Sequence, residues 1–344
     1  MKIAFIGDLH FGCRNSNQVI QRHQEIFLEK VFWPYIKEQG IKTIIQTGDY
    51  FDNRKWINLQ TMSFQKRVFV DKAKELDVVV HGIIGNHDIP LRHSLSMNSP
   101  QQILTDDHMN FYSEPKVINF DGIDITFIPW VCKENAEEIT AVIKAGGDLL
   151  VGHLETQGAV LLPGRLSDEG YAPKDFKKWK EVISGHYHTQ NKIANVHYIG
   201  LPYQLMWNDT ASKQGFWILD TTDRSWEFIE NEYSYFHRLT WNDGCDYNLE
   251  LLADSYVKVN IKKKTSFEEF ERFIDKVNFQ VPFEVKIVES FEEYNQENVK
   301  DIIQLSSTTE LIGEYIDDVA TDNNKESIKN LMIDIYEEAM SIEE

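Results

Sequence analysis

The sequence has few cysteines, and their spacing excludes cysteine-based frameworks. The three cysteines, Cys13, Cys132 and Cys245, lie far apart and form no C-x-x-C pair, so they support neither a disulfide framework nor a thiolate metal site. No apolar stretch approaches membrane-spanning length, so we expect no membrane association. The N-terminal MKIAFIGD meets an aspartate after one short apolar run, which predicts a first strand and not a signal peptide. These absences favour a cytoplasmic protein.

Basic residues are also scarce. The 35 Lys and Arg residues against 55 Asp and Glu give a net charge of −20, which disfavours a nucleic-acid partner because phosphates need a cationic surface. The charge is uneven, since 289–344 hold 16 acids and 3 lysines, a net of −13, and 1–288 carry −7. Two bound divalent cations would bring 1–288 to −3. The acidic tail is interpreted either as a piece that faces a protein partner or as a solvated surface.

Up to about residue 155, short β-branched strands alternate with helical stretches, which is the pattern of an α/β fold. Helices are predicted over 18–38 and 60–76, and Asp121-Gly122 is typical of a hairpin turn. The strands predicted in this part are 2–7, 42–47, 78–84, 117–120, 123–130 and 149–152. Strands dominate afterwards, which predicts mixed sheets; they are 181–185, 193–200, 215–220 and 225–230.

A domain boundary is predicted near 231–250, where the periodicity lapses. It separates a first domain, 1–235, from a small β-α-β domain at 246–295. That domain has candidate strands at 256–263 and 283–289 around a helix at 267–277, which Ser266 and Glu269 would cap. The remaining region, 296–344, predicts two amphipathic helices with acidic outer faces.

Five short motifs lie at or just after predicted strand ends, and each begins with glycine. Ligands of open α/β sheets collect outside the carboxyl ends of the strands, and glycine permits a sharp turn there that exposes the next side chain. One motif alone is a weak signal, since an isolated histidine such as His153 is more often structural. As a set they predict one shared site: GDLH (7–10), GDYFD (48–52), GNHD (85–88), GH (152–153) and GHYH (185–188).

The side chains of these motifs are carboxylates, amides and imidazoles. Such donors suit Mn²⁺, Fe or Zn²⁺, whereas the lack of nearby thiolates disfavours a structural zinc. Asp-x-His and His-x-His place two donors on the same side of an extended segment, so both reach one ion cluster. An aspartate can also bridge two cations, and a pair held ~3.5–4 Å apart clamps a phosphoryl group and activates a water.

In this order, the set D-x-H, G-D-x-x-D, G-N-H-D, G-H and G-H-x-H resembles the calcineurin-like metallophosphoesterase superfamily over about residues 1–230. The resemblance implies an α/β fold in which a two-sheet sandwich of mixed strands is flanked by helices. It also implies two divalent metal ions per chain, Mn²⁺ in the first place and Mg²⁺ as the alternative. The implied ligands are Asp8, His10, Asp49 and His188 for one ion, and Asp49, Asn86, His153 and His186 for the other.

The resemblance gives the remaining residues of GNHD other roles. His87 would not bind metal but would face the phosphate and protonate the leaving oxygen as a general acid. Asp88 either orients a neighbour or is purely structural, and the sequence leaves both interpretations open. Asp52 stands where some relatives have a histidine that contacts the phosphate, so its role is open as well.

Within the superfamily, the sequence resembles the nuclease subunit of SbcCD-type double-strand-break repair complexes, in the short form of T4-like bacteriophages. FIPW (127–130) and the block at 199–220 resemble the segments around the last histidine motifs. The β-α-β unit resembles a DNA-capping domain, and the terminal helices resemble the helix-loop-helix that docks on a partner ATPase. The resemblance implies an Mn²⁺-dependent DNA nuclease, 3′→5′ exonucleolytic on duplex ends and endonucleolytic on single strands. It further implies a homodimer with an SbcC-type, SMC-like ATPase, in the host cytoplasm if a phage encodes it.

The contact residues for DNA and partner are chosen by charge and by spacing. An ordinary solvated face is the alternative for each basic residue, and packing on the chain's own domain is the alternative for the apolar stripe. The DNA candidates are Arg14, Arg54, Lys177, Lys178 and Lys263. The stripe expected to contact the ATPase is Ile328, Leu331, Ile335 and Tyr336.

Two other functions remain open at the level of sequence. A superfamily phosphoesterase that acts on nucleotides or phosphoproteins would share every ligand but would have no use for the β-α-β unit. An inactive scaffold that only organises the ATPase is the second, and the intact ligand set disfavours it.

Overall fold

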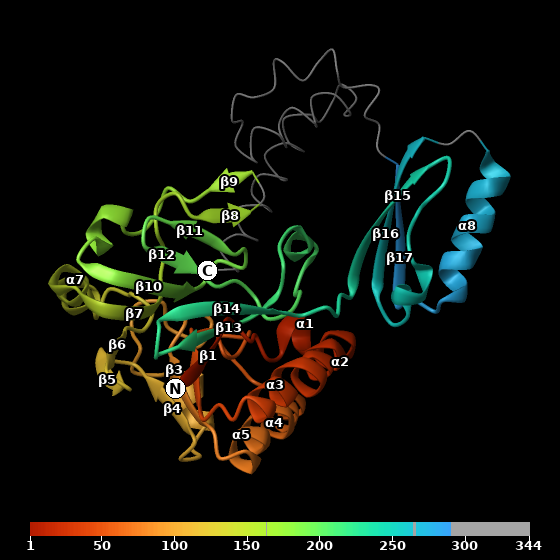
Figure 1. Cartoon of the computed structure of the whole chain (residues 1–344). Helices are drawn as coiled ribbons and strands as arrows, with labels where there is room; N and C mark the ends of the chain where they lie inside the picture. The colour runs from red at the N-terminus through yellow and green to blue at the C-terminus, as the bar shows by residue number, and fades with distance from the viewer. Residues whose placement is uncertain (163, 264–265, 290–344) are drawn as a thin grey trace, which may run out of the picture. The chain divides into compact units, whose positions relative to one another are not determined.

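The computed structural model describes residues 1–289 except 163 and 264–265 (Figure 1). Residues Met1–Val288 form one compact unit. Within the described residues, none of the helices combines the length and the apolar character that a membrane crossing requires. The terminal helices and the stripe Ile328, Leu331, Ile335 and Tyr336 lie outside the described residues, so their predictions stay predictions.

Two six-stranded sheets form the main body, which confirms the two-sheet fold of mixed strands that the family resemblance implies. The first sheet has the order β14 (Ser225–Glu230), β13 (Gly215–Asp220), β1 (Lys2–Ile6), β2 (Thr43–Gln46), β3 (Val79–Ile83) and β4 (Met109–Tyr112). The second has the order β11 (Asn191–Ile193), β12 (Val196–Tyr198), β10 (Trp179–Gly185), β7 (Gly147–His153), β6 (Ile123–Phe127) and β5 (Lys116–Phe120). Strands β1 to β4 are parallel, and so are β6, β7, β10 and β12. The sheets are mixed because β13, β14, β5 and β11 run antiparallel to their neighbours. A short hairpin of β8 (Val160–Leu162) and β9 (Arg165–Leu166) is separate.

The strands are apolar on both faces because both faces are covered. Phe5 and Ile45 of the first sheet pack against Phe127 and Val151 of the second in a layer between the sheets. Side chains alternate along a strand, so Ile44 belongs to the other face, where helices cover the first sheet. Helix α7 (Ala136–Ala145) covers the outer face of the second sheet. The predicted turn at Asp121-Gly122 is confirmed, with φ of 53° and 85° between β5 and β6.

The two long predicted helices are continuous but contain wider turns. The first runs through α2 (Gln18–Phe27), the π-helical η1 (Leu28–Phe32) and α3 (Trp33–Glu38), and the second through α4 (Leu59–Gln65), the π-helical η2 (Lys66–Val70) and α5 (Asp71–Glu75). Pro34 has no N–H to donate to the preceding turn, which favours the widening at η1. The Trp33 indole donates to the carbonyl of Val68 at 2.8 Å, so the two wide turns are tied together. Two further short helices are α1 (Cys13–Ser16) and α6 (Ser99–Ile103).

The small sheet contains a strand that the sequence did not indicate. Its order is β15 (Phe236–Asn242), β16 (Tyr256–Lys263) and β17 (Glu284–Glu289), with α8 (Phe267–Phe279) on one face. The strands and the helix predicted after residue 255 are present, but β15 occupies the region in which periodicity lapses. The apolar–polar alternation of β15 is hidden in the sequence because one of its buried positions is the polar His237, which is followed by the polar Arg238. Ser266 Oγ accepts the amide of Glu269 at 3.3 Å, which confirms the predicted cap of α8.

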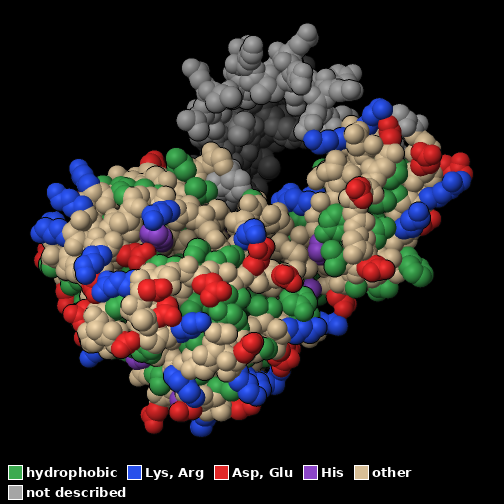
Figure 2. All heavy atoms as spheres, viewed as in Figure 1, with side chains coloured by type: hydrophobic (Ala, Val, Ile, Leu, Met, Phe, Trp, Pro, Cys, Tyr) green, Lys and Arg blue, Asp and Glu red, His purple; other side chains and the backbone are tan. Residues whose placement is uncertain are grey.

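Charges of both signs are interspersed on the surface. On the face drawn in Figure 2, Lys and Arg side chains lie among Asp and Glu side chains. Arg224, for example, donates to both carboxylate oxygens of Asp148 at 2.8 and 2.7 Å. Pairs of this kind at the surface contribute little to stability but reduce the repulsion that a net charge of −7 over 1–288 implies.

His237 makes the stability of the small sheet sensitive to acid. Its Nδ1 lies 2.7 Å from the Tyr247 hydroxyl, and burial lowers its pKa to about 4 from 6.5. The unfolded chain binds this proton more readily, so the stability that neutral His237 contributes is complete above pH ~6.5 and is lost as the pH falls toward 4. Between pH 7 and 5 the wild type should lose about 2 kcal/mol of unfolding free energy that a His237→Gln variant does not lose. Urea titrations at both pH values measure this, and equal losses would contradict it.

Candidate metal centre

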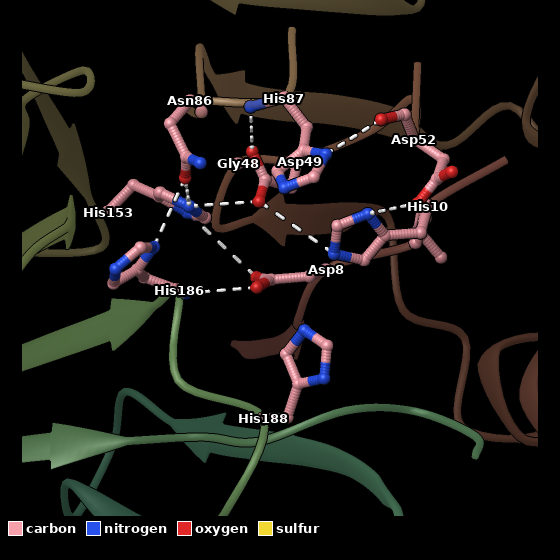
Figure 3. Close-up of polar contacts among 12 residues, drawn as sticks. Asp8, His10, Gly48, Asp49, Asp52, Asn86, His87, His153, His186 and His188 are labelled. Carbon is pink, nitrogen blue, oxygen red and sulfur yellow. Dashed lines mark hydrogen bonds and ion pairs between the residues drawn. The ribbon is translucent and has the colours of Figure 1, made fainter. Parts of the chain in front are cut away.

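The five motifs meet at one edge of the sandwich (Figure 3). Within each sheet the strands that carry them are parallel neighbours, so their carboxyl ends lie side by side. Asp8 follows β1, Asp49 follows β2 and Asn86 follows β3, all in the first sheet. His153 ends β7 and His186 follows β10 in the second sheet. Figure 3 shows that the predicted ligands and His87 face one another: Asp8, His10, Asp49, Asn86, His153, His186 and His188.

One group of donors centres on His153. Its Nε2 lies 2.9 Å from Asn86 Oδ1 and 3.2 Å from Asp49 Oδ2. The same Asn86 oxygen lies 3.1 Å from His186 Nδ1. Four side chains from four strand ends therefore direct nitrogen or oxygen atoms to one point.

A second group of donors lies on the other side of Asp49. The ligand atoms of Asp8, His10 and His188 all lie within 4.8 Å of one another. His10 Nε2 is 3.7 Å from Asp49 Oδ2, the oxygen that also faces His153. Asp49 thus stands between the two groups, as a bridging carboxylate would.

The residues of both groups fit divalent cations. Asp8 Oδ1 and both ring nitrogens of His10 are buried and make no hydrogen bond among the described residues, and a buried polar atom without a partner costs about 1–3 kcal/mol. Burial lowers the pKa of His10, but the carboxylates of Asp52, Asp49 and Asp8 outweigh it and raise the value to about 9. His153 reaches about 9 for the same reason, since Asp49 and Asp8 outweigh its burial. A cluster that attracts protons onto two buried imidazoles also favours cations that bind oxygen and nitrogen.

Close approach explains most of the motif glycines. A Cβ on Gly85 would lie 2.2 Å from Asp49 Oδ1, and a Cβ on Gly185 would lie 2.4 Å from Asp8 Oδ1. Neither distance is possible, so these positions need a residue without a side chain. The expected sharp turn is found at Gly48, where φ is +99°.

Three of the candidate ligands have a left-handed backbone. The φ angles are 44° at His10, 53° at Asp49 and 83° at His186. This region is unfavourable for residues other than glycine and is found where surrounding structure enforces it. Here the amides of Leu9 and His10 both donate to the carbonyl of Asp49, at 3.1 and 3.0 Å, and hold the two loops together.

His87 and Asp88 of the GNHD motif make different contacts. The amide of His87 donates to Asp49 Oδ1 at 2.7 Å, which places its ring beside both donor groups. Asp88 is fully buried and accepts the amides of Gly85, Tyr50 and Phe51 at 2.9, 3.3 and 3.0 Å. Burial and the charge of Asp49 raise the pKa of Asp88 to about 7. These contacts tie the GNHD loop to the GDYFD loop and are compatible with both interpretations of Asp88.

The basic residues predicted to contact DNA lie at different distances from the metal centre. Arg54 is half-buried and interacts electrostatically with Asp49. The Arg14 guanidinium lies 5.4 Å from the centre of the Phe236 ring. Lys177 and Lys178 precede β10, whereas His186 follows it, so the seven residues of β10 separate them from the centre by about 20 Å. Their location does not support a phosphate contact next to the metal donors. Lys263 lies 2.8 Å from the carboxylate of Asp243.

Sequence reasoning did not select three side chains that lie next to the candidate ligand histidines. Asp209 Oδ1 lies 3.4 Å from His188 Nδ1, and Glu155 Oε1 lies 3.6 Å from His186 Nε2. The Trp130 ring is 5.1 Å from the His186 ring. Trp130 ends the FIPW segment and Glu155 follows His153 by two residues, so both had a weak signal. Asp209 had no such signal, because it lies outside the five motifs, in the short helix Trp207–Ala211.

Comparison with known proteins agrees with this geometry. The model of one family, calcineurin-like phosphoesterase, matches residues 1–254. Exonuclease subunit 1 of Enterobacteria phage T4 is 32% identical over 344 residues, which cover 98% of this chain and 99% of the T4 protein. Both matches extend beyond the two main sheets into the small one.

Two solved structures are more distant. An archaeal phosphodiesterase is 11% identical, with 67% of this chain and 100% of that chain covered and a TM-score of 0.36. A protein of unknown function from Aquifex aeolicus is 19% identical, with 53% and 88% covered and a TM-score of 0.26. Scores this low support no conclusion. The family match and the T4 relative do, and the chain belongs to the calcineurin-like phosphoesterase family, whose metal-dependent chemistry its donor cluster fits.

Proposed function

We propose that the chain is a metal-dependent DNA nuclease that hydrolyses phosphodiester bonds in recombination and repair. The activities proposed are 3′→5′ exonuclease on duplex ends and endonuclease on single strands. The observation that carries the proposal is the pair of donor groups that share Asp49, with His87 beside them. The name of the T4 relative, an exonuclease subunit, supports DNA as the substrate.

Two cations would occupy the two donor groups. Asp49 belongs to both; Asp8, His10 and His188 complete one group, and Asn86, His153 and His186 complete the other. Mn²⁺ is the proposed ion and Mg²⁺ the alternative, because these donors suit hard and borderline cations. When bound, such a pair neutralises the charge of the phosphodiester and activates water.

His87 is proposed to supply a proton to the leaving oxygen. Its Nδ1 lies 2.7 Å from the carbonyl of Asp52, which accepts the Nδ1 proton and leaves Nε2 for the substrate. Burial lowers the pKa of His87, against the opposing charge of Asp49. An imidazolium with a lowered pKa releases its proton readily, as a general acid requires.

A basic face of the small sheet is proposed to bind the DNA backbone. Arg238 of β15 is the direct partner of Lys258 in β16, and both point away from the face that α8 covers. Both cations lie over the Trp207 ring, with Arg238 Cζ at 5.4 Å and Lys258 Nζ at 4.4 Å from its centre. Burial lowers the pKa of Lys258, and the charges of Arg238 and Lys286 add to this.

Like charges directly opposite each other on a sheet are unfavourable without a counter-charge. A phosphate backbone would supply it, and phosphate contacts dominate the affinity of proteins for DNA. Trp207 opens the short helix Trp207–Ala211, which also carries Asp209, the partner of His188. The basic face therefore borders the metal centre, and it supports a polymeric substrate over a small phosphomonoester.

The remaining assignments are proposals about assembly. The small domain is proposed to begin at Phe236, because β15 pairs with β16 along its length, and the phosphoesterase domain to comprise residues 1–235. Residues 296–344 are proposed to bind an SbcC-type ATPase, and the T4 relative's designation as a subunit supports a partner. A homodimer and a location in the host cytoplasm complete the proposal.

Loss of Asp49 should remove both ions. We expect the wild type to bind two Mn²⁺ per chain in isothermal titration calorimetry and Asp49→Ala to lose this binding at micromolar concentrations, because both donor groups use this carboxylate. Asp124→Ala, which removes an exposed aspartate from β6, is the control and should bind two. Two ions retained by Asp49→Ala would refute the shared ligand.

Loss of His87 should separate chemistry from metal binding. His87→Ser should slow the release of mononucleotides from linear duplex DNA in Mn²⁺ by about 10²–10⁴-fold, because a general acid contributes on that order. Its Mn²⁺ affinity should stay close to that of the wild type, since His87 is outside both donor groups. His197→Ser in β12 is the matched control. Unchanged cleavage by His87→Ser would exclude His87 from the mechanism. A wild type that cleaves only soluble phosphomonoesters would refute the proposed nuclease activity.

The basic face should control affinity for DNA and its salt dependence. The double variant Arg238→Ala, Lys258→Ala should bind a short duplex more weakly, and the slope of log K against log salt should fall by about 0.9 for each phosphate that the variant no longer neutralises. Fluorescence anisotropy at four salt concentrations measures both quantities. Lys276→Ala on α8, on the opposite face, should leave the slope as it is. An identical slope in the double variant would place the DNA elsewhere.

A further inference from the structure

A cavity of about 310 Å³ lies beside the donor group that centres on His153. Glu155 is part of its lining, and Glu155 Oε1 lies 3.6 Å from Nε2 of the candidate ligand His186. The centre of the Trp130 ring lies 5.9 Å from that of the His153 ring and 5.1 Å from that of the His186 ring. We call this space the Trp130 cavity, and its lining residues are Trp130, Val131, His153, Glu155, Gly170 and Tyr171.

The lining of the Trp130 cavity disfavours a phosphate and favours a flat ring that donates a hydrogen bond. Among the described residues that line it, none is a lysine or an arginine, the side chains that most often bind phosphates. Trp130 and Tyr171 are partly exposed and offer aromatic rings, on which nucleobases stack. The carboxylate of Glu155, once ionised, only accepts hydrogen bonds. A volume of 310 Å³ is at the small end of ligand sites, so the cavity suits one base and not a base pair.

Backbone contacts hold the lining of the Trp130 cavity in place. The amide of Tyr171 donates to the carbonyl of Glu155 at 3.0 Å. A Cβ on Gly170 would lie 2.1 Å from the same carbonyl oxygen, so this close approach needs glycine. The amide of Trp130 donates to the carbonyl of Ile84 at 2.7 Å. The aromatic rings and the carboxylate are therefore positioned before a substrate binds, which lowers the cost of binding it.

The position of His87 indicates which nucleotide reaches the Trp130 cavity. The His87 ring lies next to the His10 ring, with centres 4.9 Å apart, whereas the cavity borders His153. If His87 protonates the leaving oxygen, the strand that ends in this oxygen lies on the His10 side. The nucleotide that keeps the phosphate is then directed to the His153 side. In a 3′→5′ exonuclease this is the 3′-terminal nucleotide, which is released as a 5′-mononucleotide.

We propose that the Trp130 cavity binds the base of the nucleotide that is released, and that Glu155 accepts a hydrogen bond from the exocyclic amino group of this base. Adenine, cytosine and guanine carry such a group, whereas thymine has two carbonyl oxygens beside its single N–H. The carboxylate repels these oxygens, so Glu155 discriminates against thymine. The inference rests on the proposed function, which supplies the strand polarity and the role of His87.

The first measurement is the release of the 3′-terminal nucleotide from duplexes that end in dA or in dT. Both ends close with an A·T pair, so their fraying is matched. In Mn²⁺ the wild type should have a kcat/KM about 3- to 10-fold higher on the dA end, the value of one net hydrogen bond. Glu155→Gln should lose the preference, because an amide donates to thymine as readily as it accepts from adenine. Glu138→Gln, which changes an exposed acid of α7, is the matched control and should keep it.

The second measurement tests the stacking ring. Trp130→Ala should raise KM on both duplex ends about 5- to 150-fold, the usual contribution of a base stacked on an aromatic ring, whereas Trp130→Phe keeps a ring and should stay within about threefold. Calorimetry should find two Mn²⁺ per chain in Trp130→Phe and in Glu155→Gln, because neither change removes a candidate ligand. If Trp130→Ala does not fold, Trp130→Leu, which fills more of the space without a ring, takes its place.

The third measurement is the equilibrium binding of mononucleotides, which does not depend on DNA cleavage. The Mn²⁺-loaded wild type should bind dAMP about 3- to 10-fold more tightly than dTMP, again the value of one net hydrogen bond. Glu155→Gln should bind the two nucleotides alike, and Trp130→Ala should bind both more weakly than the wild type.

Three results would overturn the proposal. Equal values of kcat/KM on the dA and dT ends in the wild type would refute recognition of the base by Glu155. A preference that survives in Glu155→Gln would assign the recognition to another residue. An unchanged KM in Trp130→Ala would show that the base does not enter the Trp130 cavity. A wild type that cleaves no DNA but binds dAMP more tightly than dTMP would refute the proposed function and still support the cavity as a base site.

Discussion

Burial of negative charge at one point is the constraint on which the rest of this structure depends. Asp8 and Asp49 are at most 2% exposed, and Asp49 Oδ2 faces a histidine on each side. Carboxylates withdrawn from water repel each other and lose hydration, so they persist only where positive charge compensates them. Without cations, the carboxylates instead raise the pKa values of His10 and His153 to about 9, so both imidazoles carry positive charge at neutral pH. Divalent cations would compensate the buried carboxylate charge more completely.

The sandwich supplies the rigidity that this concentration of charge requires. Parallel strands of two sheets end at the same edge, and the layer between them is closed by side chains such as Phe5, Phe127 and Val151. The loops that follow are held in unfavourable conformations, with φ of 53° at Asp49 and 83° at His186. Strain of this kind is tolerated because the packed sheets and the buried brace of Asp88 define the loop positions.

Two features surround the metal centre: carboxylates next to its histidines, and a short segment that leads to the small sheet. Carboxylate oxygens of Asp52, Glu155 and Asp209 lie 3.2, 3.6 and 3.4 Å from the outer ring nitrogens of His10, His186 and His188. Asp209 also accepts the amides of Leu205 and Met206 at 2.7 and 2.8 Å. Through the helix that begins at Trp207, the same loop reaches Arg238 and Lys258 of the small sheet. One short segment, residues 205–209, therefore connects the metal centre to the basic face.

The sequence by itself determined the candidate donors, their order along the chain and the α/β class of the fold, because glycine motifs at strand ends and apolar runs are local features. It also determined the hairpin at Asp121-Gly122 and the cap at Ser266, since turn and cap chemistry acts over two to three residues. Only the tertiary structure decided that Lys177 and Lys178 lie at the opposite end of β10, and that Arg238 and Lys258 face each other. It alone gave Asp52 and Asp209 their partners. These are relations between segments distant in the chain, and side-chain spacing carries no information about a neighbour that arrives from another strand.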